Sequence, residues 1–371
     1  MVILYSGEYP GASAGAKRIG LYQKGIEEAG ASAKIVTTFR PSRGRFGFYL
    51  NALLQPFLVF FKVIRQDNKS NLLFVYGYNW DSLLFIRIAT CIKGQKMIIE
   101  INEKPGTCYG NRLTELSIVK NLNRILLTRL ALPLIDGFVV ISEQLKDYLV
   151  PFQGKQAKIL KVPILIDPAL PHTDLTVENS PLLKPFLLHA GALSERKDGI
   201  IGVFEAFAIA NQKLNHKLHF YLTDKLAPSE VKRSIENVIK ENQLEDNVHF
   251  VNRLSEKELL IYQQQCSLLI LNKPDNEQNR YNFPTKLGEY LRLKKPVIYT
   301  PVGEMANYLK DGINAFEVPV DRPDLLAEKI VFVIENPEQV KPIAEQGAAF
   351  AQNEFNYRVQ GKRLKTFFDT F

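Results

Sequence analysis

The chain has 371 residues, 46% of them apolar and 23% charged, which is typical of a globular protein with two domains of about 150–200 residues, each with its own core. Three cysteines without a CxxC pair exclude a disulfide framework and a sequence-evident metal site, and they indicate a reducing compartment. No signal peptide is recognisable, and the longest apolar run, residues 50–64, falls short of the ~20 residues that cross a bilayer. We therefore expect a cytoplasmic protein.

The charge is unevenly distributed. Residues 1–168 carry 22 Lys and Arg against 12 Asp and Glu, whereas the remainder carries 25 against 27. One interpretation is uneven solvation of two domains. The other is an N-terminal domain that faces anionic lipid or a pyrophosphate-linked substrate. No helix-turn-helix, zinc finger or aromatic-basic RNA motif occurs, so we expect no nucleic-acid partner.

The first elements predict the opening of a Rossmann-like unit. A strand over residues 2–6 is followed by a small-residue loop, residues 7–15, and by a helix over residues 16–29. The loop lacks the GxGxxG spacing of a dinucleotide site, and no acidic residue closes the next strand, residues 33–37. A dehydrogenase is therefore disfavoured.

Residues 40–49 combine arginines, glycines and aromatic residues, and they precede an apolar helix predicted over residues 50–64. A basic and aromatic loop beside an apolar helix is typical of a segment in the headgroup region of a membrane. A core helix with a solvated approach is the alternative, and both interpretations stay open.

Polar residues follow the predicted strand over residues 96–101. Asn102 and Glu103 come at its carboxyl end, where open α/β sheets bind their ligands. The first histidine of the chain is His172, so a histidine base or metal ligand from the N-terminal half is excluded. Glu103 is either a strand-end salt bridge or a carboxylate that orients a substrate hydroxyl. After strands over residues 137–141 and 158–162, four prolines within residues 168–185 mark an interdomain linker.

A second Rossmann-like unit begins with the strand that runs into Gly191. Its predicted helices and strands continue to the capping box that starts at Ser255, and two helices over residues 337–352 and 355–368 end the chain. His216 and His219 have no cysteine or carboxylate cluster nearby and are interpreted as surface residues.

Residues 281–304 contain several groups that could bind a ligand. Thr285 is predicted to cap a short helix over residues 287–293, and a strand over residues 297–299 follows. The free amides of residues 285–287 would suit a phosphate, and Glu289, one turn inside the helix, would suit a ribose diol. The alternative is an ordinary loop–helix–strand unit.

The segment FPTKLGEYLRLKKPVIYTPVGE, together with GALSERKDG at residues 191–199 and SEQLKDYL at residues 142–149, resembles family 4 glycosyltransferases. These are retaining enzymes of the GT-B fold. The resemblance implies an α/β protein with two Rossmann-like domains facing a central cleft and a C-terminal helix that crosses back to the N-terminal domain. An acceptor domain would comprise residues 1–167 plus 355–371, and a donor domain residues 168–354.

The resemblance also implies roles for residues. Lys197 matches the lysine that neutralises the donor diphosphate, and Glu289 matches the second glutamate of a Glu-x7-Glu pair. The first glutamate position is Tyr281, and the family arginine beside Gly191 is Ala192. The implied catalytic residues are Lys197, Glu289 and Glu103. The implied donor-binding residues are Gly191, Lys197, Arg253, Thr285, Lys286, Leu287 and Glu289. The implied acceptor or phosphate loops hold Gly11, Gly15 and Asn102, the last standing with Glu103 where relatives carry His-Asp.

The function implied is retaining transfer of a sugar from a nucleotide-diphosphate donor to a lipid-linked or saccharide acceptor, in cell-surface polysaccharide or glycolipid assembly. Neither a metal nor a cofactor is expected. An anionic membrane surface, met by the N-terminal domain on the inner face, is a further possible partner. A sugar-nucleotide epimerase of GT-B architecture and a catalytically silent nucleotide-sugar-binding scaffold subunit are the alternatives.

Overall fold

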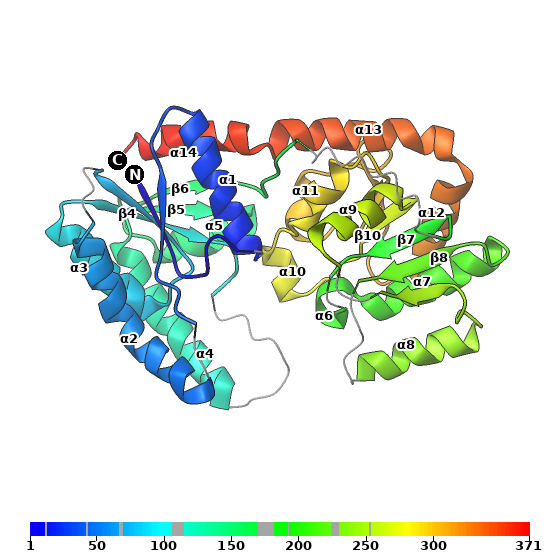
Figure 1. The fold of residues 1–371 in the computed structure, drawn as a ribbon, viewed down its shortest axis with the longest axis horizontal. Helices are drawn as coiled ribbons and strands as arrows, with labels where there is room; N and C mark the ends of the chain where they lie inside the picture. The colour runs from blue at the N-terminus through cyan, green and yellow to red at the C-terminus, as the bar shows by residue number, and fades with distance from the viewer. Residues whose placement is uncertain are drawn as a thin grey trace. The chain divides into compact units, whose positions relative to one another are not determined.

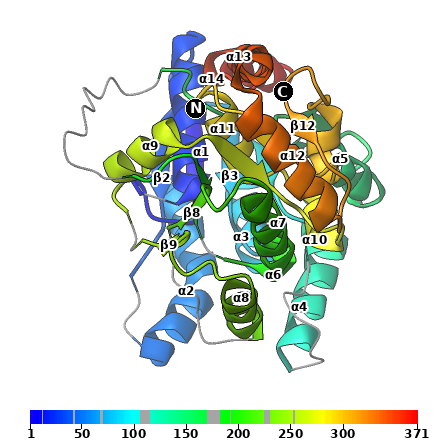
Figure 2. The same ribbon diagram turned by 90° about the vertical axis from the view of Figure 1, so that its right-hand side faces the viewer.

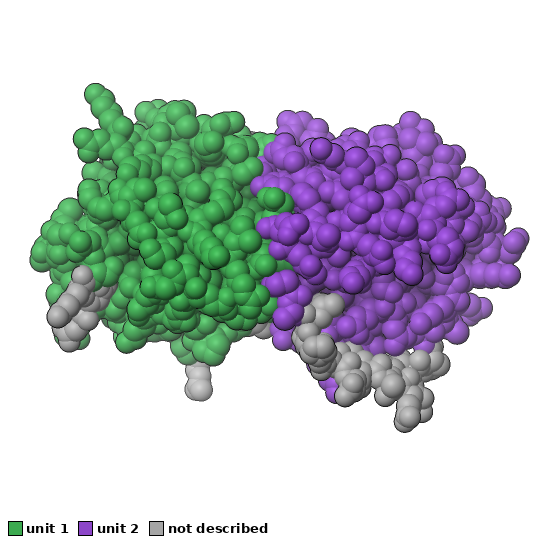
Figure 3. Space-filling view, turned by 90° about the horizontal axis from the view of Figure 1, so that it is seen from above, with its two compact units in different colours: residues 1–167, 281–283, 354–371 green, residues 168–280, 284–353 purple. Residues whose placement is uncertain are grey.

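The computed structural model describes residues 1–11, 13–41, 44–66, 70–105, 115–169, 182–191, 193–223, 230–251 and 254–371. The chain forms two compact units (Figure 3). Unit 1 comprises Met1–Asp167, Tyr281–Phe283 and Glu354–Phe371, and unit 2 comprises Pro168–Arg280 and Pro284–Asn353. Each unit is described below by itself.

Unit 1 is built on a parallel six-stranded sheet of order β2-β1-β3-β4-β5-β6 (Figure 1). Two of its inner strands, β1 and β5, have no charged residue and are fully buried, as expected for a parallel sheet covered on both faces. The strands are β1 (Val2–Tyr5), β2 (Lys34–Thr37), β3 (Leu72–Tyr76), β4 (Lys96–Ile101), β5 (Gly137–Val140) and β6 (Lys158–Lys161). The helices are α1 (Ala14–Glu28), α2 (Gly44–Ile64), α3 (Trp80–Ile92), α4 (Glu115–Leu126), α5 (Glu143–Leu149) and α14 (Tyr357–Phe368).

Unit 2 repeats the architecture with a parallel sheet of order β12-β11-β10-β7-β8-β9. Helices α7 and α12 lie side by side against its apolar core (Figure 2). The strands are β7 (Phe186–His189), β8 (His219–Leu222), β9 (Val248–Phe250), β10 (Leu268–Leu271), β11 (Val297–Tyr299) and β12 (Phe316–Glu317). The helices are α6 (Glu195–Asp198), α7 (Ile200–Lys213), α8 (Glu230–Glu241), α9 (Glu256–Gln265), α10 (Glu277–Tyr281), α11 (Lys286–Leu291), α12 (Pro323–Glu335) and α13 (Pro337–Glu354).

The last helix returns to unit 1, as predicted. Ile166 bridges to Asn356, and α14 then packs closely against α1 (Figure 1). The two helices meet at Gly25 and Gly361, where a Cβ on either residue would collide with the other helix's backbone. Glycine at both positions therefore sets how closely α1 and α14 approach.

Several local predictions are confirmed and others are wrong. Ser255 forms the predicted capping box with Glu258, and Ser142, for which no cap was predicted, caps α5. The predicted loop over residues 40–49 is wrong in its second half, because α2 already begins at Gly44. His219 is half-buried rather than a surface residue. Within the described residues, no helix has both the length and the hydropathy to span a membrane.

Candidate functional site

A single helical turn, α6, follows the first strand of unit 2. It begins at Ser194, whose Oγ accepts a hydrogen bond from the Lys197 amide at 3.1 Å. It ends at Gly199, which has a left-handed φ of +51°. A Cβ at Gly199 would stand 2.6 Å from Asn272 Nδ2, so both the backbone conformation and the close approach require glycine there.

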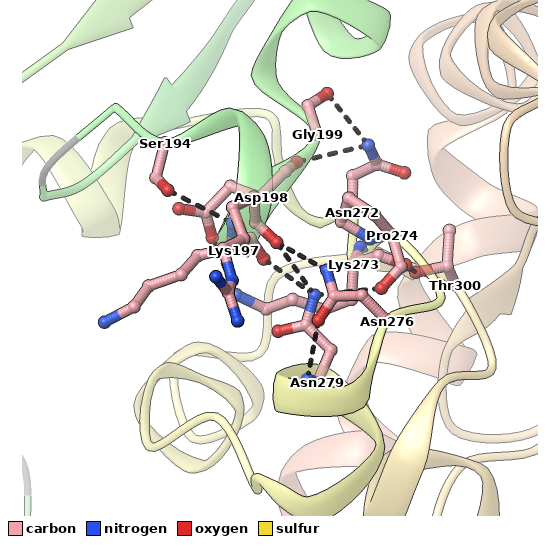
Figure 4. Close-up of polar contacts among 11 residues, drawn as sticks. Ser194, Lys197, Asp198, Gly199, Asn272, Lys273, Pro274, Asn276, Asn279 and Thr300 are labelled. Atoms are coloured by element: carbon pink, nitrogen blue, oxygen red, sulfur yellow. Dashed lines mark hydrogen bonds and ion pairs between the residues drawn. The ribbon is translucent and has the colours of Figure 1, made fainter. Parts of the chain in front are cut away.

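Three asparagines after β10 hold the carbonyl end of α6 (Figure 4). Asn272 Nδ2 donates to the carbonyls of Asp198 and Gly199 at 3.2 and 3.1 Å. Asn276 Nδ2 donates to the Arg196 carbonyl at 2.8 Å, and Asn279 Nδ2 reaches Pro274 at 2.9 Å, with longer contacts to two α6 carbonyls. These amides satisfy carbonyls that a one-turn helix leaves unpaired. They fix the backbone of Lys197, whose exposed side chain extends away from them in Figure 4.

A buried ion pair lies beside this turn. Lys273 Nζ is 2.6 Å from Asp198 Oδ1, and both side chains are 12% exposed. Thr300 accepts from the Lys273 amide at 2.7 Å and donates to the Lys273 carbonyl at 2.9 Å. Lys273 is therefore held by both its main chain and its side chain.

Lys286, the first residue of α11, reaches the turn after β7. Gly191 has a φ of +107° there, and its amide donates to Thr223 Oγ1 at 2.8 Å. A Cβ at Gly191 would stand only 3.1 Å from Lys286 Nζ, so glycine leaves room for the ammonium group.

The ammonium groups of Lys197, Lys273 and Lys286 form one electrostatic group, which we call the lysine cluster. Burial lowers the pKa of Lys286, and the charges of Lys273 and Lys197 lower it further, against the opposing effect of Asp198 and Glu289. Asp198 is already paired with Lys273. An anion that met the cluster would relieve the repulsion among its cations, so the arrangement is suited to a phosphate or diphosphate.

Of the predicted donor residues, Lys197 and Lys286 belong to the lysine cluster. Gly191 and the half-buried Glu289 are neighbours of Lys286. Arg253 lies outside the described residues.

The cap predicted at Thr285 is wrong. Its backbone is already helical, with φ −58° and ψ −29°, and its exposed hydroxyl makes no capping bond. The buried Leu287 donates its amide to the Pro284 carbonyl at 3.0 Å, and α11 has only six residues. The helix start thus offers fewer free amides than the sequence indicated.

Tyr281, which stands at the position of the family's first glutamate, belongs to unit 1. Its carbonyl accepts a hydrogen bond from Ser142 Oγ at 2.8 Å. Its ring centroid lies 4.5 Å from Lys104 Nζ and 6.0 Å from the ring of Tyr148. A cation–π contact therefore takes the place where a carboxylate was expected.

Unit 1 contains a cavity of about 420 Å³ at the carboxyl ends of β3 and β4. Asn102 and the exposed Glu103 line it, together with Tyr78, Trp80 and Arg124. Trp80 is fixed by a hydrogen bond from its Nε1 to Asn123 Oδ1 at 3.0 Å. Aromatic faces beside amides and charged groups are a lining suited to a polar ring compound.

A buried carboxylate also lines the cavity. Glu100 Oε1 accepts from Arg18 Nε at 2.6 Å and from the Tyr22 hydroxyl at 2.8 Å, and burial raises the pKa of Glu100 despite the Arg18 charge. The Asn102 amide is near enough to lower that pKa a little, but its hydrogen bond goes to the Tyr76 hydroxyl at 2.7 Å. Among the described residues, neither Glu100 Oε2 nor Asn102 Oδ1 has a hydrogen-bond partner. Buried acceptors of this kind favour a ligand that brings hydroxyl groups.

The two predicted loop glycines do not line this cavity. A Cβ at Gly15 would stand 2.9 Å from the Tyr5 hydroxyl and 3.2 Å from Tyr76 Cε1. At Gly11 it would stand 2.8 Å from the Glu8 carbonyl oxygen. Close packing within unit 1 is sufficient to account for glycine at both positions.

The sequence interpretation missed the asparagines of residues 272–279, the Lys273–Asp198 pair, and the Arg18–Glu100 pair. One pattern pointed to the first group: NKPDNEQN directly follows a buried strand, at the edge where parallel α/β sheets bind ligands. No comparable pattern marked Glu100, which lies inside an otherwise apolar strand.

Comparisons with known proteins find relatives of this chain by sequence and by fold. The model of the family "Glycosyl transferases group 1" matches residues 173–350. An uncharacterized glycosyltransferase of Methanocaldococcus jannaschii is 30% identical over 120 residues. That match covers 32% of this chain and 32% of the archaeal protein, so the chain aligns with about a third of the length of its curated relative.

Solved structures resemble the whole chain at low identity. Sucrose-phosphate synthase from Thermosynechococcus elongatus superposes with a TM-score of 0.72 at 16% identity, covering 100% of this chain and 98% of that one. Anabaena HepE, solved with UDP and glucose, gives a TM-score of 0.69 at 16% identity with both chains fully covered. At such identities the likeness establishes the fold, which is GT-B. Residues 173–350, a little under half of the chain, match the group 1 glycosyltransferase family.

Proposed function

We propose that the chain is a retaining glycosyltransferase that moves a sugar from a nucleotide-diphosphate donor, bound by unit 2, to an acceptor hydroxyl bound by unit 1. The lysine cluster carries this proposal, because the charges of Lys197 and Lys273 both act on Lys286, and of the two carboxylates that oppose them one is already paired. Such a surplus of positive charge matches a diphosphate. Anabaena HepE, which shares the fold, is known with UDP-glucose, and this supports a nucleotide sugar as the donor.

In the proposed reaction, breaking the sugar–phosphate bond leaves negative charge on the diphosphate. Lys197 and Lys286 stabilise that charge, and Lys273 holds Asp198 and the α6 turn in place. Gly191 gives the diphosphate close access to the backbone, and Glu289 binds the ribose hydroxyls. The acceptor hydroxyl oxygen bonds to the anomeric carbon from the face that the diphosphate leaves, and its proton passes to the departing diphosphate, so no protein nucleophile is required. With the charge supplied by ammonium groups, we propose that the reaction proceeds without a divalent metal.

On the acceptor side, the unit 1 cavity is proposed to hold a sugar ring of a saccharide or lipid-linked acceptor. Trp80 and Tyr78 provide aromatic faces, while Glu100 Oε2 and Asn102 Oδ1 are acceptors for its hydroxyl groups. Glu103, which also lines the cavity, is proposed to orient the attacking hydroxyl. We propose that the product enters cell-surface polysaccharide or glycolipid assembly.

The test removes one ammonium group at a time. Lys197→Ala and Lys286→Met are each expected to lower sugar transfer by at least about a hundredfold, because each removes charge stabilisation of the leaving diphosphate. Lys310→Ala, which removes an exposed lysine elsewhere in unit 2, is the matched control. Transfer at the wild-type rate in both cluster variants would refute the assignment. Loss of transfer on adding EDTA would refute the metal-free mechanism alone.

Two measurements separate the alternatives. An epimerase converts the nucleotide sugar when no acceptor is added, which NMR of the donor alone detects. A silent scaffold subunit binds the nucleotide in calorimetry but transfers sugar to no acceptor in a panel of saccharides and lipid-linked saccharides.

A further inference from the structure

Helix α2 is apolar on its outer side as well as on its inner side. Val59 and Val63 are 0% and 2% exposed and belong to the core-facing side. On the opposite side stand Tyr49, Leu53, Phe57 and Phe61, with exposed fractions of 69%, 70%, 51% and 52%. We call these four residues the outer stripe.

The spacing of the outer stripe is regular. Its members follow one another at i, i+4, i+8 and i+12, so they form one row along the helix surface. Leu50 and Leu54, 43% and 39% exposed, flank the row. A helix that is hydrophobic on all sides normally lies inside a protein or a membrane, whereas this one has its outer row in the open.

Helix α3 extends the apolar surface. The ring centroids of Phe57 and Phe85 are 4.9 Å apart, which joins the two helices at the outer stripe. Ile88 and Ile92 lie three and seven residues after Phe85, on the same side of α3, and are 52% and 66% exposed. The apolar surface therefore spans two packed helices.

The stretch of sequence that contains the outer stripe carries charge of one sign. From residue 29 to residue 66 the sequence has six Lys and Arg and no Asp or Glu. Two of these cations, the exposed Lys62 and Arg65, come at the end of the stripe. Arg65 Cζ lies 5.8 Å from the Phe61 ring centroid, so a cation stands beside an aromatic ring of the stripe. Apolar side chains bordered by cations are complementary to a surface of acyl chains and anionic headgroups.

We propose that the outer stripe of α2, with Ile88 and Ile92 of α3, docks on an anionic membrane surface, with α2 lying parallel to the membrane. The proposal stands independently of the glycosyltransferase reaction. Docking would also bring the unit 1 cavity near the membrane, because Trp80 and Leu83 at the start of α3 line that cavity. Helix α3 thus runs from the cavity to the docking surface over about 20 Å, so a membrane-anchored acceptor would have its sugar within reach of the cavity.

The test is co-sedimentation of the full chain with vesicles of phosphatidylcholine alone or with phosphatidylglycerol added. We expect binding to the anionic vesicles that weakens with salt. Leu53→Asp is expected to weaken it at least about tenfold, because it replaces an apolar side chain that would enter the membrane with a charge that anionic lipid repels. Lys62→Gln and Arg65→Gln are each expected to weaken it about fivefold.

The matched control is Ile313→Asp, which places the same charge on a residue of unit 2 that is 51% exposed. It should bind vesicles like the wild type. Leu53→Ser replaces Leu53→Asp if thermal unfolding shows that the charged variant does not fold. Failure of the wild-type chain to bind anionic vesicles overturns the proposal. So does a dimer in solution that Leu53→Asp dissociates, since a second copy would then cover the stripe.

Discussion

Lys286 is a cation in surroundings that disfavour its charge. Burial is the largest cause of its lowered pKa, and the neighbouring ammonium groups act in the same direction. A bound diphosphate would act in the opposite direction and raise the pKa of Lys286. Binding of the nucleotide and protonation of this one amine are therefore linked.

From this linkage we expect the affinity for the donor nucleotide, measured with UDP as the probe, to fall with rising pH. The affinity is complete below the lowered pKa of free Lys286 and is lost as the pH rises through it, by up to about tenfold per pH unit. Calorimetry from about pH 7 to about pH 10 measures this dependence, and proton uptake appears as a buffer-dependent heat. Lys286→Met should bind more weakly, with a flatter profile over the same range. An unchanged profile in that variant would contradict the linkage.

Gly191 gives a second expectation at this scale. Gly191→Ala must hold an L residue at a φ of +107° and place a methyl group 3.1 Å from Lys286 Nζ. We expect a loss of about 1–2 kcal/mol in the free energy of unfolding, together with at least about tenfold weaker UDP binding.

The matched control is Gly202→Ala, in α7. A Cβ there meets nothing within 4 Å, and glycine in a helix interior is costly, so this variant should gain about 0.5–1 kcal/mol and bind UDP normally. Urea unfolding and calorimetry compare the two variants. If Gly191→Ala behaves like Gly202→Ala, the tight turn has no role.

The site residues that the sequence predicted share one property, namely that a local motif contains them. Gly191, Lys197, Lys286 and Glu289 lie in two short segments whose patterns are recognisable one at a time. Lys273 was not predictable in this way, because its partner Asp198 lies 75 residues earlier. The two meet only because β10 pairs with β7 in the sheet, and strand order is not readable from either segment.

At the scale of elements, the sequence predicted best where burial is complete. β3 is a run of apolar residues, and such runs indicate strands of a covered parallel sheet. The start of α2 was missed because Gly44 and Gly47 disfavour a helix, whereas tertiary packing of the following turns extends it. Thr285 failed as a cap for a different reason: its backbone is already part of the helical turn.

Strands β8 and β9 carry a histidine pair with a pH consequence. His219 Nδ1 lies 3.1 Å from His249 Nε2, and His249 stacks on Tyr221 at a centroid distance of 4.5 Å. Burial lowers the pKa of both rings, and the His219 charge lowers that of His249 further. In the folded chain both histidines therefore bind protons less readily than in the unfolded chain.

Since the folded-state pKa values are lowered, this contribution to stability is present above the unfolded histidine pKa of about 6.5 and is lost as the pH falls below it. We expect the urea midpoint of wild type to decrease between about pH 7 and about pH 5.5. His249→Gln should reduce this decrease, and the exposed His216→Gln should leave it unchanged. Equal decreases in all three proteins would show that other groups cause the acid sensitivity.

At the scale of the whole molecule, each unit has a core of its own. Phe74 and Ile98 lie in the core of unit 1, and Phe204, Phe207 and Phe220 lie in that of unit 2. Two-domain chains commonly unfold in more than one step, so we expect two transitions in calorimetry. The packing of α14 on α1 in unit 1 was predictable only from the family resemblance, because the sequence of α14 does not indicate which helix it contacts.

The same substitution in two helices should separate these transitions. Gly361→Ala, in α14, brings a methyl group against the backbone of Gly25 in unit 1. Gly347→Ala, in α13, places one 2.5 Å from the Asn314 carbonyl oxygen in unit 2. Each should lower one transition, by about 1–3 kcal/mol in unfolding free energy, and leave the other in place. UDP should raise the transition that Gly347→Ala lowers. If both variants lower both transitions equally, the units do not unfold independently.

The crossing of α1 and α14 has a consequence for biosynthesis. Helix α1 leaves the ribosome early, but its partner is among the last residues to be translated. About 330 residues lie between the two helices, and their synthesis takes about 16–66 s at about 5–20 residues per second. Throughout that interval the nascent chain presents the uncovered face of α1 to chaperones. The first half of the polypeptide completes its folding only after the second half has been made.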